Sequence, residues 1–199
     1  MPGSRAAGDR GGGGDRVPAR GGHRLRHALI LTFGEISGAH FNPAVTLAEA
    51  VGGGLAWRDV PAYVAAQIAG AFGGVAVAHL MFGAPVFFAS RHARSGPAQL
   101  LGELVATFGL LAVIHGCARH RAAAVPYAVA AYITAAYWFT SSTSFANPAV
   151  TLARAASDTF AGIRPADAPA FIAAQLVGAA AATGYFRWLL PPPRAASRR

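Results

Sequence analysis

The string NPAVTLA occurs twice, at residues 42–48 and 147–153, and holds the chain's only asparagines, Asn42 and Asn147. Asparagine is a strong helix N-cap because its side chain suits the non-helical first position of a helix. Proline is favoured at the next position, since it lacks an N–H group that would be unpaired there. Each string therefore predicts the start of a helix, with an amide side chain at its tip.

Both of these helices are expected to be short. The first starts at Asn42 and ends at the glycines 52–54, so it has about ten residues and is about 15 Å long, half of a bilayer core. The second starts at Asn147 and is expected to continue to about Phe160. A helix N-terminus carries roughly half a positive charge. Two such ends at the membrane midplane would repel cations, and neutral hydroxylated molecules could hydrogen-bond to the amides in passing.

No other group of residues has the spacing of a reactive site. The sequence contains no paired carboxylates, no metal-spaced histidine cluster and no Ser/His/Asp set, so we expect neither an enzyme, a metal site nor a cofactor. The single cysteine, Cys117, lies in an apolar run, where a packing role is expected. All 17 basic residues are arginines in the termini and between apolar runs. This placement suits membrane flanks better than a nucleic-acid partner.

The apolar runs are long enough to cross a bilayer. Of the 199 residues, 54% are hydrophobic, and the stretches 60–90, 122–153 and 168–186 contain no Asp, Glu, Lys or Arg. A bilayer core requires about 20 residues of apolar helix. A soluble Ala-rich core is the alternative, but soluble helices normally show a polar face and these show none. We therefore expect an all-α, polytopic membrane protein. Spans are predicted at 60–83, 97–118, 122–140 and 168–190.

The repetition extends beyond the two short strings. DVPAYVAAQIAG at 59–70 matches DAPAFIAAQLVG at 167–178. Two matched blocks in the same order indicate an internal duplication, and coincidence in an Ala-rich chain is the alternative. A repeat with an odd number of spans inverts its successor, and the second half supplies three. The short helices would then enter the membrane from opposite faces and meet tip to tip.

These residues resemble the aquaporin and glycerol-facilitator family of major intrinsic proteins. The resemblance rests on SGAHFNPAVTLAEAV and SFANPAVTLARA, together with AAQIAG and AAQLVG, and covers about residues 27–190. It implies an inverted-repeat bundle of six spans and two half-helices in the cell (inner) membrane, assembled as a homotetramer with one pore per subunit. The residues matching the two family motifs are Asn42, Pro43, Ala44, Asn147, Pro148 and Ala149.

The same resemblance assigns roles to residues in the later spans. Glu103, in LGELVATFG, matches the family's glutamate that braces a pore loop, and an interfacial carboxylate is the alternative. Gln67 and Gln175, with Gly70 and Gly178, match positions of the third and sixth spans. The two glycines are expected to permit close approach of helices.

The sequence departs from the family at the narrowest point of the pore. An arginine usually follows the second NPA, and Val150 stands there. Counting back from Asn147 places the other filter positions near Ala135 and Ser144. Small and apolar groups at these positions imply a wider, less polar constriction. Arg154, one turn further on the same face, would partly replace the missing charge, or would be solvated or brace a loop.

The first half of the chain is shorter than the second. A full span begins 50 residues before Asn147, and the equivalent position would precede Met1. The family's first span is therefore expected to be missing, from a truncated product or a misassigned start, and the second is reduced to about 27–37. Residues 1–26 are rich in Gly and Arg and are expected to be disordered. The expected domains are a leader at 1–26, a channel at 27–190 with repeats at 27–83 and 97–190, and a solvated tail at 191–199.

These observations predict a passive channel for small neutral solutes. Water and glycerol are candidates from the resemblance. Arsenite is a third, because NPAVTLARAASDTFAGIRPAD is similar to bacterial members associated with arsenic-resistance genes. The alternative is a non-conducting remnant, or an assembly partner of a full-length channel.

Overall fold

The computed structural model describes residues 19–190, and for residues 19–27 the backbone alone. Within this range the chain is helical and contains no strand, in agreement with the expected all-α class. The α-helices are α1 (Ala19–Ser37), α2 (Pro43–Gly52), α3 (Val60–Met81), α4 (Pro97–His120), α5 (Val125–Phe139), α6 (Pro148–Arg154) and α7 (Ala168–Leu189). Short 3₁₀ helices at Trp57–Asp59, Ala122–Ala124 and Pro165–Asp167 precede α3, α5 and α7.

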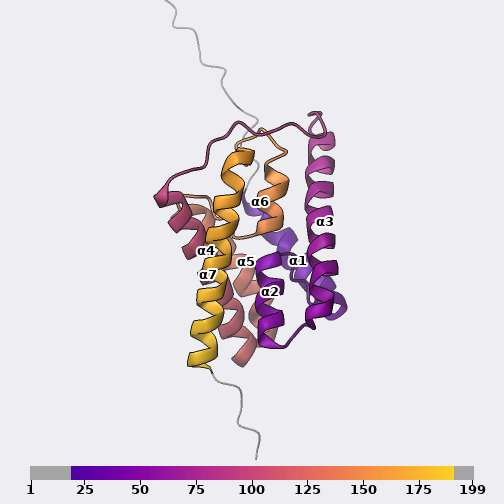
Figure 1. The fold of residues 1–199 in the computed structure, drawn as a ribbon. Helices are drawn as coiled ribbons and strands as arrows, with labels where there is room; N and C mark the ends of the chain where they lie inside the picture. The colour runs from indigo at the N-terminus through magenta and orange to yellow at the C-terminus, as the bar shows by residue number, and fades with distance from the viewer. Residues whose placement is uncertain (1–18, 191–199) are drawn as a thin grey trace, which may run out of the picture.

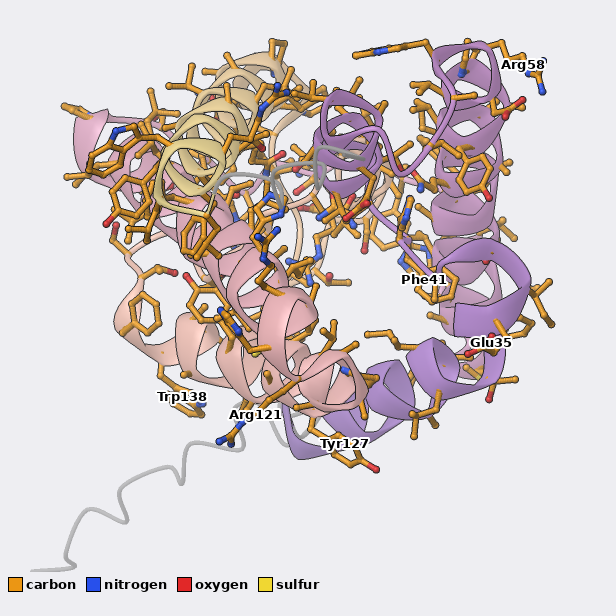
Figure 2. All side chains as sticks on the ribbon, turned by 90° about the horizontal axis from the view of Figure 1, so that it is seen from below. Glu35, Phe41, Arg58, Arg121, Tyr127 and Trp138 are labelled. Carbon is orange, nitrogen blue, oxygen red and sulfur yellow. The ribbon has the colours of Figure 1, made fainter. Side chains whose placement is uncertain are left out.

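Four helical segments are long and apolar enough to cross a membrane, and they agree with the predicted spans to within a few residues. They are Trp57–Met81, Pro97–His120, Ala122–Phe139 and Pro165–Leu189. In Figure 2, Trp138 and Tyr127 project from the outside of the ring of helices, and Trp138 is 80% exposed. Large exposed aromatic side chains suit the boundary between lipid and water.

Helix α1 begins earlier than the apolar pattern predicts. Its shorter apolar part is Ala28–Ser37, but the helix starts at Ala19, inside the segment 1–26 that was expected to be disordered. Alanine, leucine and arginine are good helix formers, so the helix extends from the apolar run into the arginine-rich sequence. Residues 1–18, and the tail 191–199, lie outside the described residues.

The half-length helices α2 and α6 lie in the middle of the bundle, one above the other in Figure 1. Both pack against α3 and α7, and they contact each other. Around them, α4 lies along α7 and also contacts α5, and α1 lies along α5. This is the tip-to-tip arrangement that the inverted repeat predicts.

The equivalent helices α7 and α3 have different surroundings. A Cβ atom added to Gly178 of α7 would overlap the backbone of Leu104 in α4, so α4 and α7 touch at that glycine. A Cβ atom added to Gly70, the matching residue of α3, would have no described atom within 4 Å, so the expected close approach of a helix stays a prediction there. Only 6% of the apolar window containing α3 is buried, against 33% for α4 and for α7. The described part of the chain therefore leaves one face of α3 uncovered.

Helix α6 is much shorter than expected, because it ends at Arg154 and not near Phe160. In a longer helix the carbonyl groups of Ala155 and Ala156 would accept bonds from the following turn. Here they accept bonds from the backbone N–H groups of Ser90 and Phe88, at 3.0 and 3.2 Å. The helix ends in tighter bonds to carbonyls three residues back, from the N–H groups of Ala155, Ala156 and Ser157, and the connection between α3 and α4 then pairs with the carbonyls beyond its end.

Candidate functional site

The loops that lead into α2 and α6 have the same unusual backbone shape. Ala39 and Phe41 have positive φ angles of 48°, and their counterparts Ser144 and Ala146 have 50° and 46°. Left-handed conformations are uncommon for residues other than glycine, and they occur most often where function requires them. The duplicated sequences therefore produce duplicated loops, although the side chains at these positions differ.

The two asparagines cap the helices as the sequence predicts. Oδ1 of Asn42 accepts a hydrogen bond from the backbone N–H of Ala44 at 2.9 Å. Oδ1 of Asn147 accepts from the N–H groups of Ala149 and Val150, at 3.0 and 3.3 Å. A proline follows each asparagine at the first helical position, where its missing N–H group costs nothing.

The amide nitrogens of the asparagines link the two helix tips. Nδ2 of Asn42 donates to the carbonyl of Ala146 at 2.7 Å, and Nδ2 of Asn147 donates to the carbonyl of Phe41 at 2.8 Å. Both asparagines are only 2% exposed. The sequence predicted that the amides would serve a solute. In the structure each side-chain amide donates one N–H to a carbonyl of the opposite loop, and these two bonds join the helix tips.

Glu103 holds the loop that leads into α6, which we call the second loop; the first loop is the one that leads into α2. Its side chain is fully buried, and its carboxylate accepts from the backbone N–H groups of Phe145 and Ala146, each at 2.8 Å. Gln175 donates to the same carboxylate at 2.6 Å and to Thr151 Oγ1 at 2.9 Å. These contacts position the loop from α4 and α7, which is the role that the family resemblance implies for Glu103.

The first loop has no equivalent carboxylate among the described residues. Gln67 Nε2 donates to Thr46 Oγ1 at 2.8 Å, just as Gln175 bonds Thr151. His40 Nδ1 lies 3.2 Å from the same hydroxyl. The buried Oε1 of Gln67 has no hydrogen-bond partner in the described part of the chain. Both repeats therefore share the hydrogen bond between a glutamine and a threonine, but among the described residues only the second has a carboxylate, Glu103, at its loop.

Three cavities border the half-helices, and neighbouring cavities share lining residues. The first, about 830 Å³, is an open groove lined by Asn147 and Val150, by Phe41, and by Ala66 and Gly70 on the uncovered face of α3. The second, about 360 Å³, shares His40 and Phe41 and is lined by Asn42. The third, about 490 Å³, meets the second at Glu49 and Ala118 and lies near the end of α7. Phe41 lies on the inner side of the ring of helices (Figure 2).

The three expected filter residues have different environments. Val150 lines the cavity of about 830 Å³. Ser144 is buried, and its hydroxyl has no hydrogen-bond partner among the described residues. Ala135 is exposed on α5. The structure thus puts Val150 beside Asn147 in a cavity wall, whereas neither Ser144 nor Ala135 lines the cavities described above.

Arg94 is a site residue that the sequence marks only as one of the arginines between apolar runs. It is 5% exposed, and its guanidinium donates to the carbonyls of Gly162, Ser142 and Phe160, at 2.7, 3.1 and 2.9 Å. Burial lowers the pKa of Arg94, and the nearby charge of Arg154 lowers this pKa further. All these partners are more than 45 residues away in sequence, so no local pattern could have predicted them.

His79, a buried histidine near the end of α3, contacts the segments that follow α3 and α6. His79 Nδ1 lies 2.7 Å from the carbonyl of Val86, and Nε2 lies 2.9 Å from Ser157 Oγ. The segment after α3 is thereby tied to the segment after α6. Together with Arg94, this histidine makes the surroundings of the second loop rigid.

Comparison with known proteins is consistent with this geometry. Residues 25–137 match the sequence profile of the family described as Major intrinsic protein. The chain is 57% identical over 166 residues to the aquaglyceroporin AqpS of Rhizobium meliloti (strain 1021), covering 83% of this chain and 71% of that protein. It is 47% identical over 92 residues to aquaporin NIP1-3 of Oryza sativa subsp. japonica, covering 45% of this chain and 32% of the rice protein. Aquaporin NIP1-1 of Zea mays is 45% identical over 92 residues, 45% of this chain and 33% of the maize protein.

Proposed function

The chain belongs to the major intrinsic protein family of membrane channels, which are not enzymes, and on this premise we propose that it conducts small uncharged hydroxylated solutes. The proposed solutes are glycerol and neutral metalloid hydroxides such as arsenous acid, with water as a further permeant. The proposed setting is the inner membrane, with four copies assembled as a homotetramer. The observation that carries the proposal is that cavities border the linked tips of α2 and α6, one beside Asn147 and one beside Asn42.

The path follows residues that successive cavities share. A solute that enters beside Val150 meets Asn147, passes His40 and Phe41, and reaches the cavity lined by Asn42. From there the path continues to the third cavity near the end of α7. Irregular backbone at membrane depth is tolerated where it is buried in protein or lines a wet cavity, and the two capped loops fit both conditions.

The wall of the middle cavity has two chemical sides. One side is polar and consists of the first loop, with Asn42 and His40. The carbonyl groups of Gly38 to His40 accept no hydrogen bond from the described residues, so they are available to a hydroxyl group. The other side is apolar and is lined by Leu110, Val129 and Ile133. A polyol has hydroxyl groups and a carbon skeleton, and such a wall accommodates both.

The charge of the helix tips favours neutral solutes. Each half-helix directs its positive end toward the linked asparagines. A cation in this region would meet two partial positive charges without its hydration shell, whereas a neutral molecule would not. At Val150 an apolar side chain replaces the family's arginine, which leaves more room and fewer hydrogen-bond donors. This change favours solutes larger than water.

The proposal is tested by flux measurements on the purified chain in liposomes. Stopped-flow light scattering would record water, glycerol and arsenous acid entry, and we expect faster uptake than in protein-free vesicles. Val150→Trp places an indole in the proposed path, so we expect glycerol uptake to fall to the protein-free rate. Val177→Trp makes the same change on an exposed surface of α7, and we expect wild-type uptake. No acceleration of any of the three solutes by the wild-type chain would exclude the channel.

A second candidate function is a non-conducting assembly partner. The observation that favours it is the uncovered face of α3, where Gly70 has no close neighbour among the described residues. In the same flux assay this candidate predicts protein-free rates for the chain alone, with all variants alike.

A further inference from the structure

Two arginine side chains lie against one aromatic ring beside the second loop. The Cζ atom of Arg154 is 4.3 Å from the centroid of the Phe145 ring, and that of Arg94 is 4.9 Å away. Cations are attracted to the face of an aromatic ring at this distance. Phe145 is two residues before Asn147, and its backbone N–H donates to the carboxylate of Glu103. Both charges are therefore fixed next to the loop that begins the α6 half of the proposed path.

Neither arginine forms an ion pair with a described residue. The salt bridges of this part of the chain are Arg58–Asp59 and Arg164–Asp167. Asp167 also accepts the backbone N–H of Arg94, but the guanidinium of Arg94 donates to carbonyls and to Thr143 Oγ1. A buried charge without a partner is costly, and neighbouring like charges raise that cost. The fold nevertheless holds two positive charges together here without an ion pair. The charge of Glu103 raises the pKa of Arg94, but burial and the charge of Arg154 outweigh it and lower this pKa.

Arg154 lies one helical turn beyond Val150, the residue of α6 that lines the cavity of about 830 Å³. It is four residues after Val150, so the two side chains are one turn apart, about 6 Å along the axis. The guanidinium donates to Tyr137 Oη of α5 at 3.1 Å, and it donates to no carbonyl of α6. A basic residue that only capped the helix would bond the last carbonyls. Its contacts instead hold the charge between α5 and the second loop.

We propose that Arg154, with Arg94 across the Phe145 ring, supplies the fixed positive charge that excludes cations from the α6 half of the path. This inference rests on the proposed channel function. A side chain narrows a pore only where it stands, whereas its charge acts over several ångströms in a medium of low dielectric constant. Placing the charge one turn away from residue 150 therefore keeps cations out and leaves the passage beside Val150 open to larger neutral solutes.

The test measures neutral and charged permeation in the same vesicles. Glycerol entry is recorded by light scattering, and proton entry by a trapped pH-sensitive dye under a potassium gradient with valinomycin. In Arg154→Gln we expect the protein-dependent proton conductance to rise about tenfold, the effect of removing a charge about 10 Å away at an effective dielectric constant of about 20. Glycerol entry should stay at or above the wild-type rate, which also shows that the variant is folded.

Matched variants separate the charge from other effects. Arg154→Lys keeps the charge, so we expect the wild-type proton conductance. Arg91→Gln removes an exposed arginine from the same connection as Arg94, and we expect no change. Tyr137→Phe removes only the hydroxyl that holds Arg154, so the proton conductance should rise by a smaller factor. Val150→Arg combined with Arg154→Gln should restore proton exclusion and slow glycerol entry.

The outcomes distinguish this inference from the function on which it rests. If Arg154→Gln and Tyr137→Phe both conduct glycerol without a rise in proton conductance, the inference is wrong and the channel function stands. The inference also fails if Arg91→Gln raises the proton conductance as much as Arg154→Gln does. If the wild-type chain conducts no neutral solute, the channel function itself fails, whatever the arginine variants do.

Discussion

The duplicated glycines Gly178 and Gly70 allow the same substitution to be made at one packed and one uncovered position. In Gly178→Ala, the new Cβ would overlap the carbonyl oxygen of Leu104, and this neighbour is backbone, which cannot rotate away. Helix α4 and helix α7 would have to separate locally. In Gly70→Ala, the new Cβ meets no described atom within 4 Å.

The two substitutions should have effects of opposite sign. Overpacking typically costs about 1–3 kcal/mol, and alanine gains about 0.5–1 kcal/mol over glycine inside a helix. We expect Gly178→Ala to lower the free energy of unfolding by about 1–2 kcal/mol. Gly70→Ala has the favourable helix propensity of alanine and no overpacking cost, so it should be neutral or slightly stabilising. The gain is common to both variants, so they differ by the overpacking cost of about 1–3 kcal/mol, and at about 2–4 °C per kcal/mol for a chain of this size the apparent Tm values should differ by roughly 2–12 °C.

Thermal unfolding of the two purified variants in one detergent, followed by circular dichroism, measures this difference. Each variant serves as the control for the other, because the residue change and the surrounding sequence are matched. Equal destabilisation by Gly70→Ala and Gly178→Ala would refute the reasoning, since it would mean that a close neighbour covers α3 as well. A stable Gly178→Ala would refute the assigned contact between α4 and α7.

Three other outcomes depend on the hydrogen bonds of the site. Glu103→Ala leaves three donors without an acceptor, at about 1–3 kcal/mol each, so we expect no cooperative thermal unfolding; a normal transition would contradict this. Arg94→Lys keeps the charge, but one ammonium group cannot replace the guanidinium fork. Trypsin should then cut the connection after Arg91 faster than in the wild type, and equal rates would argue against the clamp. Asn42→Asp keeps a cap but removes the donor to Ala146 and adds a negative charge, so glycerol uptake in liposomes should fall about tenfold; unchanged uptake would remove Asn42 from the path.

Local patterns predicted the elements of the fold well, because their causes are local. The start of α2 follows from Asn42 and the following proline, and its end follows from the glycines at 52–54, where Gly53 adopts a positive φ of 82°. The spans follow from uncharged runs of sufficient length. The end of α6 was missed because no glycine or proline marks it: the helix tightens into bonds to carbonyls three residues back at Ala155–Ser157, and the distant backbone of Phe88 and Ser90 pairs with the carbonyls that follow.

The site was predicted in its residues more than in its contacts. Each asparagine performs a local task and a distant one at once. The cap formed by Oδ1 joins residues two positions apart, as sequence reasoning predicts. The bond from Nδ2 of Asn42 joins it to Ala146, 104 positions away. No spacing in the sequence specifies this second bond, because it exists only once the inverted halves have met.

The distant bonds connect the two motifs by two links, and one of them leads to Glu103. Glu103 accepts from the N–H group of Ala146, the carbonyl of Ala146 accepts from Asn42, and Asn42 caps α2. A change at Glu103 therefore reaches the first helix tip through two intervening hydrogen bonds, although Glu103 belongs to the second repeat. The first loop has no acid of its own among the described residues, and its bonds to the second loop add to the contacts that Gln67 and His40 make with Thr46. The duplicated halves consequently act as one unit at their meeting point, with the carboxylate of one half fixing the tips of both.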